Sequence, residues 1–278
     1  MKKYGTTIIL LLVFLLGLSL LLYPTFADWW NSMHQSRAVA SYVENIAAID
    51  EEQYSRLWDD AWAYNRELAE RSNSFVLTDE QKTAYDQILN VGDMGIMGYI
   101  EVPAIGITLP VYHGTDEAVL QVAIGHLEWS SLPVGGESAH CVVSGHRGLP
   151  SAKLFTDLDK LVIGDVFTFC VLDEVLTYEV DQILIVEPDD TDALLIEKGK
   201  DLCTLVTCTP YGVNSHRLLV RGYRVENRAE STAVRVTADA IQIDPAIVAP
   251  IVAMPMLLVL LVILLIPKSK RGGMTDEK

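Results

Sequence analysis

The chain has 278 residues, half of them hydrophobic, and a formal net charge of −16, which suits one ordinary domain with additional segments. Six of the 21 basic and two of the 37 acidic residues lie at the termini, which leaves 15 bases against 35 acids between them. Such an acidic body repels nucleic acid and anionic lipid headgroups, so neither is a predicted ligand. The charge suits a cationic partner such as a lysine-bearing protein, although solubility alone is the simpler explanation.

Two long apolar runs lie near the ends of the chain. The C-terminal run, residues 246–267, carries no charge from Ala246 to Ile266, and about 20 apolar residues suffice to span a bilayer. Pro250 and Pro255 are tolerated in a membrane helix because neighbouring groups can hydrogen-bond the backbone carbonyls that each proline leaves without a partner. This run is predicted to be a transmembrane helix.

The N-terminal run, residues 1–27, is either an uncleaved anchor or a signal peptide. Small residues near Ala27 suit cleavage, whereas an apolar stretch from Tyr4 to Tyr23 favours an anchor. The basic residues of both termini lie outside the apolar runs. The positive-inside rule therefore predicts that both termini, including the tail at 268–278, are cytoplasmic and that the body is extracellular.

Residues 28–93 are predicted to form a largely helical extension, a region that could hold a lid. Asp50 is a candidate cap for a helix that ends near Arg71, with an apolar stripe along one face. A second helix is expected from Thr78 to about Gly92, with a glutamine at the third position after its cap. The stripe is typical of a face that packs against another domain.

Residues 94–226 change to short, alternating, β-rich runs separated by glycine and proline turns. This pattern predicts a mainly β fold, a closed or nearly closed barrel of about eight strands. Short helices are expected at 116–122 and 152–161, and residues 227–245 read as a polar linker to the second apolar run. The strand-like runs are 97–103, 107–112, 139–144, 166–172, 176–186, 202–207 and 217–225.

Of the four cysteines, only Cys208 stands at the end of a strand-like run, beside a turn. Pro210 and Gly212 force that turn, because proline lacks a ladder donor and glycine admits positive φ. Arg217 begins the next run and could face the thiol across the loop, an arrangement that suits a cysteine nucleophile beside a fixed cation. A buried structural cysteine is the equal alternative. No Cys-x-x-Cys pair is present to suggest a metal site, and opposite parity places Cys203 and Cys208 on opposite faces.

A cysteine nucleophile needs a proton carrier, and two histidines are well placed by sequence. His146 follows a strand-like run and is flanked by glycines, and His126 has a similar setting. His216 adjoins Arg217, whose charge would lower its affinity for a proton. The residues alone rank His146 and His126 equally, and a structural role remains open for both.

Two segments carry a resemblance to a known family. Residues 204–212, Thr-Leu-Val-Thr-Cys-Thr-Pro-Tyr-Gly, and residues 214–222, Asn-Ser-His-Arg-Leu-Leu-Val-Arg-Gly, resemble the active-site signature of sortases. These are cell-surface transpeptidases of Gram-positive bacteria, and the sequence of the two segments is most similar to that of the class C, pilin-polymerising group. Residues 144–161 resemble the segment that carries the histidine of that group. The resemblance covers roughly residues 94–225.

The resemblance implies a sortase-type β-barrel with Cys208, His146 and Arg217 as the active-site residues. The Cys208 thiolate would cleave a Leu-Pro-x-Thr-Gly-like sorting signal between threonine and glycine and form a thioester. His146 would act as general acid and then general base, and Arg217 would hold the substrate and the oxyanion. The acceptor in class C is a lysine amine of a pilin, and no metal or organic cofactor is implied.

One segment departs from the class C pattern. Class C enzymes usually carry a lid with an Asp-Pro-aromatic motif, whereas residues 71–79 of this chain contain no Asp-Pro pair. Phe75 is a candidate substitute plug, with burial in a packing role as the alternative. The sequence therefore leaves open whether a lid inhibits the enzyme.

Other functions remain as alternatives at this point. Within the family, a housekeeping-type enzyme would attach proteins to peptidoglycan. A catalytically silent, membrane-tethered assembly module would keep the barrel without the chemistry. A secreted cysteine protease would use water, not an amine, as the acceptor.

Overall fold

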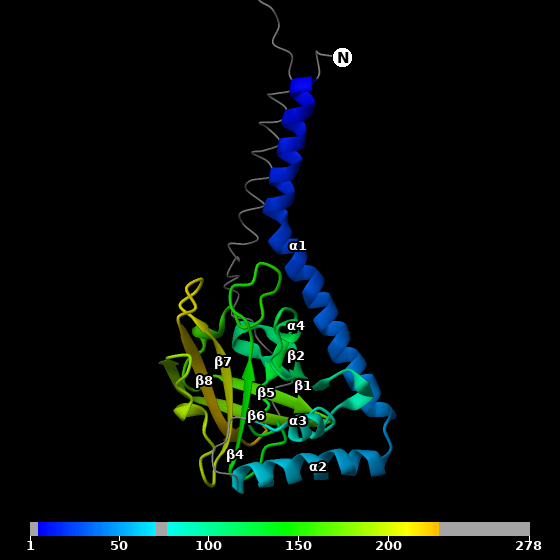
Figure 1. Cartoon of the computed structure of the whole chain (residues 1–278), viewed down its shortest axis with the longest axis vertical. Coiled ribbons are helices and arrows are strands. Elements are labelled where there is room, and N and C mark those ends of the chain that lie inside the picture. The colour runs from blue at the N-terminus through cyan, green and yellow to red at the C-terminus, as the bar shows by residue number, and fades with distance from the viewer. Residues whose placement is uncertain (1–4, 71–76, 228–278) are drawn as a thin grey trace, which may run out of the picture. The chain divides into compact units, whose positions relative to one another are not determined.

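The computed structural model describes residues 5–70 and 77–227 (Figure 1). Within the described chain, residues 5–27 and the residues from 28 onward belong to two separate compact units. The predicted second membrane helix, the cytoplasmic tail and almost all of the predicted linker lie outside the described residues, as does Phe75.

A single long helix, α1 (Gly5–Ala48), begins the described chain. From Ile8 it is long and apolar enough to cross a membrane, with a mean hydropathy of 2.5 in its most apolar window and none of that window buried. This helix is therefore a candidate anchor, although a signal sequence near an N-terminus has the same character. It continues without a break through Pro24 into the helical extension.

The second half of α1 is bound to the barrel by buried and half-buried polar contacts. The Tyr42 hydroxyl donates to the carbonyl of Met97 at 3.0 Å and accepts from the amide of Leu172 at 2.8 Å. Nearer its middle, the Asp28 carboxylate accepts from the amide of Lys153 at 2.7 Å. Because Tyr42 is fully buried between two strands, it fixes where α1 lies on the barrel.

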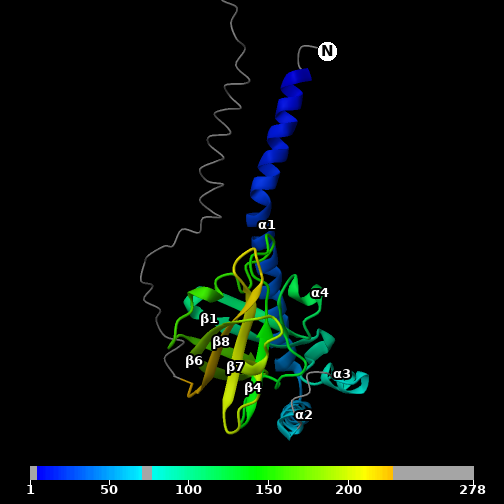
Figure 2. The ribbon, with the colours of Figure 1, turned by 60° about the vertical axis from the view of Figure 1, so that its left-hand side comes forward.

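The next helix, α2 (Glu51–Glu70), begins where the sequence predicts and lies beneath one end of the barrel (Figure 2). The Asp50 carboxylate caps it by accepting from the amide of Gln53 at 2.7 Å. Its predicted apolar stripe packs inward at Trp58, which is 8% exposed, but Trp62 remains 44% exposed. The stripe is therefore only partly a packing face.

Helix α3 (Asp79–Tyr85) has the predicted capping box at Thr78 but is shorter than expected. It ends at Tyr85, not near Gly92: residues 86–89 form a turn, and Leu89 and Gly92 adopt left-handed φ values of 59° and 71°. A right-handed helix cannot continue through such residues.

Eight strands close into one barrel in the order β1-β2-β3-β4-β7-β8-β6-β5. Two neighbouring pairs, β2 with β3 and β4 with β7, are parallel, and the remaining pairs are antiparallel. Closure removes the free sheet edges that would otherwise expose unpaired backbone groups. The strands are β1 (Ile96–Val102), β2 (Ile107–His113), β3 (Ile124–His126), β4 (Ala139–Ser144), β5 (Val166–Val171), β6 (Glu174–Val186), β7 (Asp201–Thr209) and β8 (His216–Val225).

Two short segments of the barrel differ from the sequence-based expectation. Strand β3 has only three residues, too few for alternation to reveal it, and it follows the expected short helix α4 (Glu117–Leu120). The helix expected at 152–161 is instead a series of turns ending in a 3₁₀ turn at Leu158–Lys160. Leu154 has a positive φ of 38°, which a right-handed helix does not allow. The Phe155 amide donates to the His146 carbonyl and so makes no helical hydrogen bond.

Candidate active site

The C-terminal end of β7 and the N-terminal end of β8 meet at one rim of the barrel. In the antiparallel register of these strands, Cys208 lies directly opposite Arg217 and Thr209 opposite His216. Residues directly opposite one another project to the same face, with Cβ atoms about 4.5–5.5 Å apart. The thiol and the guanidinium therefore leave neighbouring backbones on one side of the sheet.

That side is the outer face of the barrel. Cys203 and Leu205 are fully buried in the barrel core, whereas Val206 packs in a second cluster with Leu219. Cys208 has the parity of Val206 and is half-exposed, so Cys203 and Cys208 face opposite sides, as alternation predicts.

The turn between β7 and β8 holds one end of the arginine. The amides of Val213 and Asn214 donate to the Pro210 carbonyl, and Gly212 and Asn214 have positive φ values of 74° and 59°. Arg217 donates from Nη1 to the carbonyls of His216 at 3.2 Å and Asn214 at 3.4 Å. Within the described chain its Nε and Nη2 groups have no protein partner, so they remain available to a ligand.

His146 reaches the same rim through β4. In the parallel register of β4 and β7, Ser144 lies opposite Val206, and the Gly145 amide donates to the Val206 carbonyl at 3.1 Å. The Thr207 hydroxyl then donates to the Gly145 carbonyl at 2.7 Å. These contacts place the backbone of His146 beside the end of β7 that carries Cys208. Its half-exposed ring has no hydrogen-bond partner within the described residues.

Two further side chains, which sequence reasoning did not single out, connect the His146 loop to the β7–β8 turn. Arg147 donates to the Asp159 carboxylate at 2.5 Å, and its guanidinium carbon lies 5.8 Å from the centre of the Tyr211 ring. The same ring packs on Gly148, where a Cβ would approach it to 2.9 Å. Both residues lie inside the quoted motifs, but only their spatial contact reveals that they join the two loops.

His126, which the sequence ranks equally with His146, lies in a closed polar network. It is fully buried, its Nε2 lies 2.8 Å from the Ser131 carbonyl, and its Nδ1 lies 2.9 Å from the Tyr85 hydroxyl. Nε2–H therefore donates to Ser131 and Nδ1 accepts from Tyr85. Burial lowers the pKa of His126 to about 3. The ring is neutral and both of its nitrogens are hydrogen-bonded, which fits a structural role.

His140 and His216 also have protein partners. His140 is buried between the Leu195 carbonyl at 2.8 Å and the Thr204 hydroxyl at 2.7 Å, and burial lowers its pKa. The half-exposed His216 pairs with Glu187 at 3.3 Å. Neither shares the unpartnered, half-exposed state of the His146 ring.

The other three cysteines are buried among strands. Cys141 and Cys203 lie opposite each other on β4 and β7, and burial raises the pKa of the Cys141 thiol well above its usual value. Burial also raises the pKa of the Cys170 thiol. A neutral buried thiol is a poor nucleophile, so Cys208 is the cysteine suited to chemistry. In the parts of the chain that the structure describes, no group of three or more His, Cys, Asp or Glu side chains could hold a metal ion.

Comparison with known proteins identifies this arrangement. A family model described as the sortase domain matches residues 100–225. Sortase D of Bacillus subtilis is 32% identical over 131 residues, which are 46% of this chain and 63% of that protein. The chain thus spans a little under two thirds of this curated relative.

Solved structures extend the likeness over whole domains. Sortase C1 of Streptococcus agalactiae is 52% identical, with a TM-score of 0.68, over 69% of this chain and 100% of that chain. A Clostridium perfringens sortase C, solved with the C-terminal cell wall sorting motif, is 43% identical, with a TM-score of 0.62, over 69% of this chain and 100% of that one.

The barrel, the half-exposed cysteine at its rim and identity of this extent over complete sortase C domains lead to one conclusion: the chain belongs to the sortase family of cysteine transpeptidases.

Proposed function

We propose that this enzyme is a class C, pilin-polymerising sortase with Cys208, His146 and Arg217 as its catalytic residues. The observation that carries the proposal is the cross-strand pair of Cys208 and Arg217, with the His146 loop bonded to the same end of β7. Three chemical groups, a thiol, an imidazole and a guanidinium, thus share one rim and have free bonding capacity.

In the first half-reaction, the Cys208 thiolate attacks the threonine carbonyl of a Leu-Pro-x-Thr-Gly-like sorting signal. The C–N bond to glycine breaks, His146 gives its proton to the leaving amine, and a thioester to Cys208 remains. Arg217 donates its unpartnered Nε and Nη2 hydrogens to the substrate carbonyl and to the oxyanion. A fixed, always charged fork suits this task because it needs no rearrangement as charge develops.

In the second half-reaction, a lysine amine of a pilin subunit attacks the thioester. His146 removes a proton from the amine, the C–S bond breaks, and an isopeptide bond joins the two subunits. The support for this acceptor is the class C identity of the solved relatives, at 38–52% identity, whereas curated sortases A match at 24–32%. The Clostridium perfringens relative was solved with a cell wall sorting motif, which supports that class of donor.

The cellular arrangement follows from the apolar segments. The apolar part of α1 would anchor the enzyme in the membrane, residues 246–267 would form a second span, and both termini would be cytoplasmic. The catalytic barrel would then act at the cell surface, where pilin substrates are assembled.

The test is to incubate the full chain, in nanodiscs, with a sorting-signal peptide and three acceptors offered separately. These are a lysine-containing pilin fragment, a peptidoglycan cross-bridge amine and water alone. Mass spectrometry identifies the product, and the isopeptide to lysine is the expected result. A cross-bridge product indicates wall anchoring, hydrolysis alone indicates a protease, and absence of any thioester rejects the catalytic assignment.

A further inference from the structure

Three hollows lie in a row where α2 crosses the end of the barrel, with volumes of about 530, 440 and 690 Å³. Neighbouring hollows share lining residues. Tyr54 and Glu174 line both the first and the second, and Trp62 lines both the second and the third. We call this row of adjoining hollows the α2 seam.

The α2 seam has the length of an extended peptide. Six of its α2 residues recur every three or four positions and so follow one side of the helix, and the other α2 residues that line it are their neighbours in sequence. A helix of 20 residues is about 30 Å long, which equals about nine residues of extended chain. A small molecule would fill one hollow and leave the others empty. The α2 residues include Glu51, Tyr54, Trp58, Trp62, Asn65 and Ala69.

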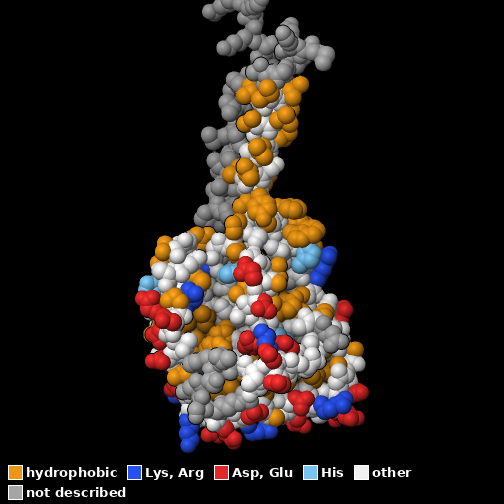
Figure 3. Space-filling view, in the orientation of Figure 1, with side chains coloured by type: hydrophobic (Ala, Val, Ile, Leu, Met, Phe, Trp, Pro, Cys, Tyr) orange, Lys and Arg blue, Asp and Glu red, His pale blue; other side chains and the backbone are white. Residues whose placement is uncertain are grey.

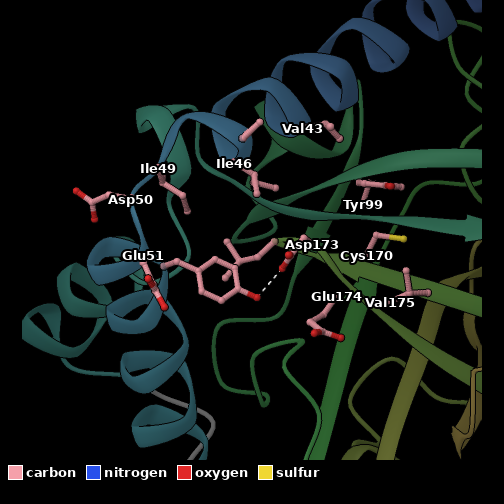
Figure 4. A pocket seen from close by; sticks show the side chains of 13 residues that line it. Val43, Ile46, Ile49, Asp50, Glu51, Tyr99, Cys170, Asp173, Glu174 and Val175 are labelled. Carbon is pink, nitrogen blue, oxygen red and sulfur yellow. Dashed lines mark hydrogen bonds between the residues drawn. The ribbon is translucent and has the colours of Figure 1, made fainter.

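The first hollow has apolar walls that remain open to solvent. Val43 and Ile46 extend from α1 towards Tyr99 and Val175 on the barrel (Figure 4). Val43 is 46% exposed and Val175 is 39% exposed. An apolar group that covered these two side chains would bind favourably, because it would remove their apolar surface from water.

The rim of the first hollow is acidic. Asp50, Glu51, Asp173 and Glu174 line it, and no lysine or arginine of the described residues does. Asp50 caps α2, and Asp173 accepts from the Tyr54 hydroxyl at 2.5 Å. Within the described parts of the chain, neither Glu51 nor Glu174 has a cationic partner.

The excess of acidic side chains is greatest at the first hollow and decreases along the seam. Among the described residues, four acids and no base line the first hollow, two acids and one base line the second, and two acids and two bases line the third. One of the bases, Arg224, lies over the Tyr178 ring at 5.9 Å. Figure 3 shows both acidic and basic side chains along the end of the molecule where α2 lies. A cationic segment would therefore be steered to the first hollow and held at its rim.

We propose that the α2 seam is a docking site for an extended, lysine- or arginine-rich segment of a partner protein, with aliphatic residues between its basic ones. The aliphatic side chains cover Val43 and Val175, and the basic groups reach Glu51 and Glu174. Long basic side chains suit this because their stems pack on apolar walls while their charges reach the rim.

The α2 seam is separate from the catalytic rim. Ala139, which lines the third hollow, pairs with Asp201 at the start of β7. Cys208 lies seven residues further along that strand, about 23 Å away at 3.3 Å per residue. A segment bound in the seam leaves the cysteine open, so one partner can dock while acyl transfer proceeds.

The experiment measures binding of labelled nine-residue peptides to the full-length Cys208→Ala variant in phosphatidylcholine nanodiscs, by fluorescence anisotropy. Without Cys208, peptide lysines cannot be consumed as acceptors, so the result does not depend on the proposed catalytic roles. The probe alternates lysine and valine around a central photo-cross-linking benzoylphenylalanine. Matched probes replace lysine by glutamate or valine by serine. We expect saturable binding of the lysine–valine probe, at least tenfold weaker binding of both matched probes, and cross-links to residues 54–62 or 173–176.

Charge reversal in the protein locates the site. The Glu51→Lys/Glu174→Lys variant should bind the lysine–valine probe at least tenfold more weakly. The control, Asp116→Lys/Asp189→Lys, makes the same change in net charge at exposed acids that line none of the three hollows, and should change binding less than twofold. Circular dichroism and thermal melting verify that both variants fold.

Three results would overturn the proposal. Equal weakening by both double variants would mean general attraction to an acidic protein. No saturable binding, or cross-links elsewhere, would mean that the seam takes no such peptide. A concentration-dependent dimer that Glu51→Lys/Glu174→Lys dissociates would assign the seam to a second copy of this chain instead.

Discussion

The buried end of β3, around His126, and the rim, around His146 and Cys208, use the same polar side-chain types in opposite ways. At His126 both ring nitrogens are bonded and the side chain is fully buried. At the rim the His146 ring and the Cys208 thiol are half-exposed and have no partner within the described chain. Saturated hydrogen bonding stabilises a fold, whereas free bonding capacity at a surface is what chemistry requires.

The comparison also shows why proximity to glycine is a poor guide to function. His126 is the last residue of β3 and His146 follows β4, and a glycine precedes each, but the packing of α3 decides between them. The Tyr85 side chain extends from α3 over His126, and its hydroxyl reaches both the His126 ring and the Gly114 amide. His146 lies beyond the reach of that helix, beside the end of β7.

The largest expected effect is at the nucleophile. Cys208→Ala should lower transpeptidation by at least about a thousandfold, because no other described cysteine is exposed enough to form the thioester. Intact-mass detection of the acyl-enzyme after incubation with a sorting-signal peptide measures this. The matched control is Cys203→Ala, which should form the thioester at the normal rate per folded molecule. A thioester in the Cys208→Ala protein would show that Cys208 is not the nucleophile.

The two histidines provide the most direct way to break the comparison. His146→Gln should reduce kcat about 10²- to 10⁴-fold, the usual contribution of a general acid–base group, with little change in melting temperature. His126→Gln should instead lower the melting temperature and leave kcat per folded molecule within about threefold. Steady-state kinetics beside thermal melting of both variants measures this. If His126→Gln reduced kcat as much as His146→Gln, the division between structural and catalytic histidines would be wrong.

The acid sensitivity of the fold sharpens the comparison. Because the folded-state pKa of His126 is about 3, below its ordinary value of 6.5, the unfolded chain binds more protons between these values. Stability is therefore fully present above pH 6.5 and is lost as the pH falls towards 3. The loss from this residue should reach about 2 kcal/mol by pH 5, at 1.36 kcal/mol per pH unit. Urea unfolding of the wild type and His126→Gln at pH 7 and pH 5 measures it, and identical pH dependence in the two proteins would contradict it.

The smallest expected effect comes from one hydroxyl in the buried network. Tyr85→Phe removes the donor to His126 Nδ1 and the acceptor for the Gly114 amide, and should cost about 1–2 kcal/mol of unfolding free energy. Transpeptidation by the folded enzyme should be unchanged. Denaturant titration gives the stability, and the control Tyr211→Phe, at an exposed ring, should be nearly neutral. A Tyr85→Phe protein as stable as the wild type would show that this network does not hold β3.

The local signals of the sequence proved accurate wherever a residue's neighbours in the chain set its conformation. The cap at Asp50, the capping box at Thr78 and most strands of the barrel are confirmed. The facing pair of Cys208 and Arg217 is confirmed as a structural arrangement, because one short turn connects their strands. Their catalytic roles, and that of His146, remain predictions.

The segments that differ from the prediction depend on contacts between distant residues. Strand β3 exists because β2 and β4 pair with it on either side, and three residues alone carry no period. Helix α3 ends early because Tyr85 is buried against β3 and the following residues turn. Residues 152–161 remain in turns because the Phe155 amide bonds to the His146 loop.

By itself, the sequence determined the membrane-length N-terminal helix, the alternating strands and the cysteine–arginine turn, because each depends on residues within a few positions of one another. Only the tertiary structure decided which histidine is buried, how the barrel closes and that α2 leaves a row of hollows against the barrel end. Burial and hydrogen-bond saturation depend on groups far apart in the chain, such as Tyr85 and His126 or Tyr54 and Asp173.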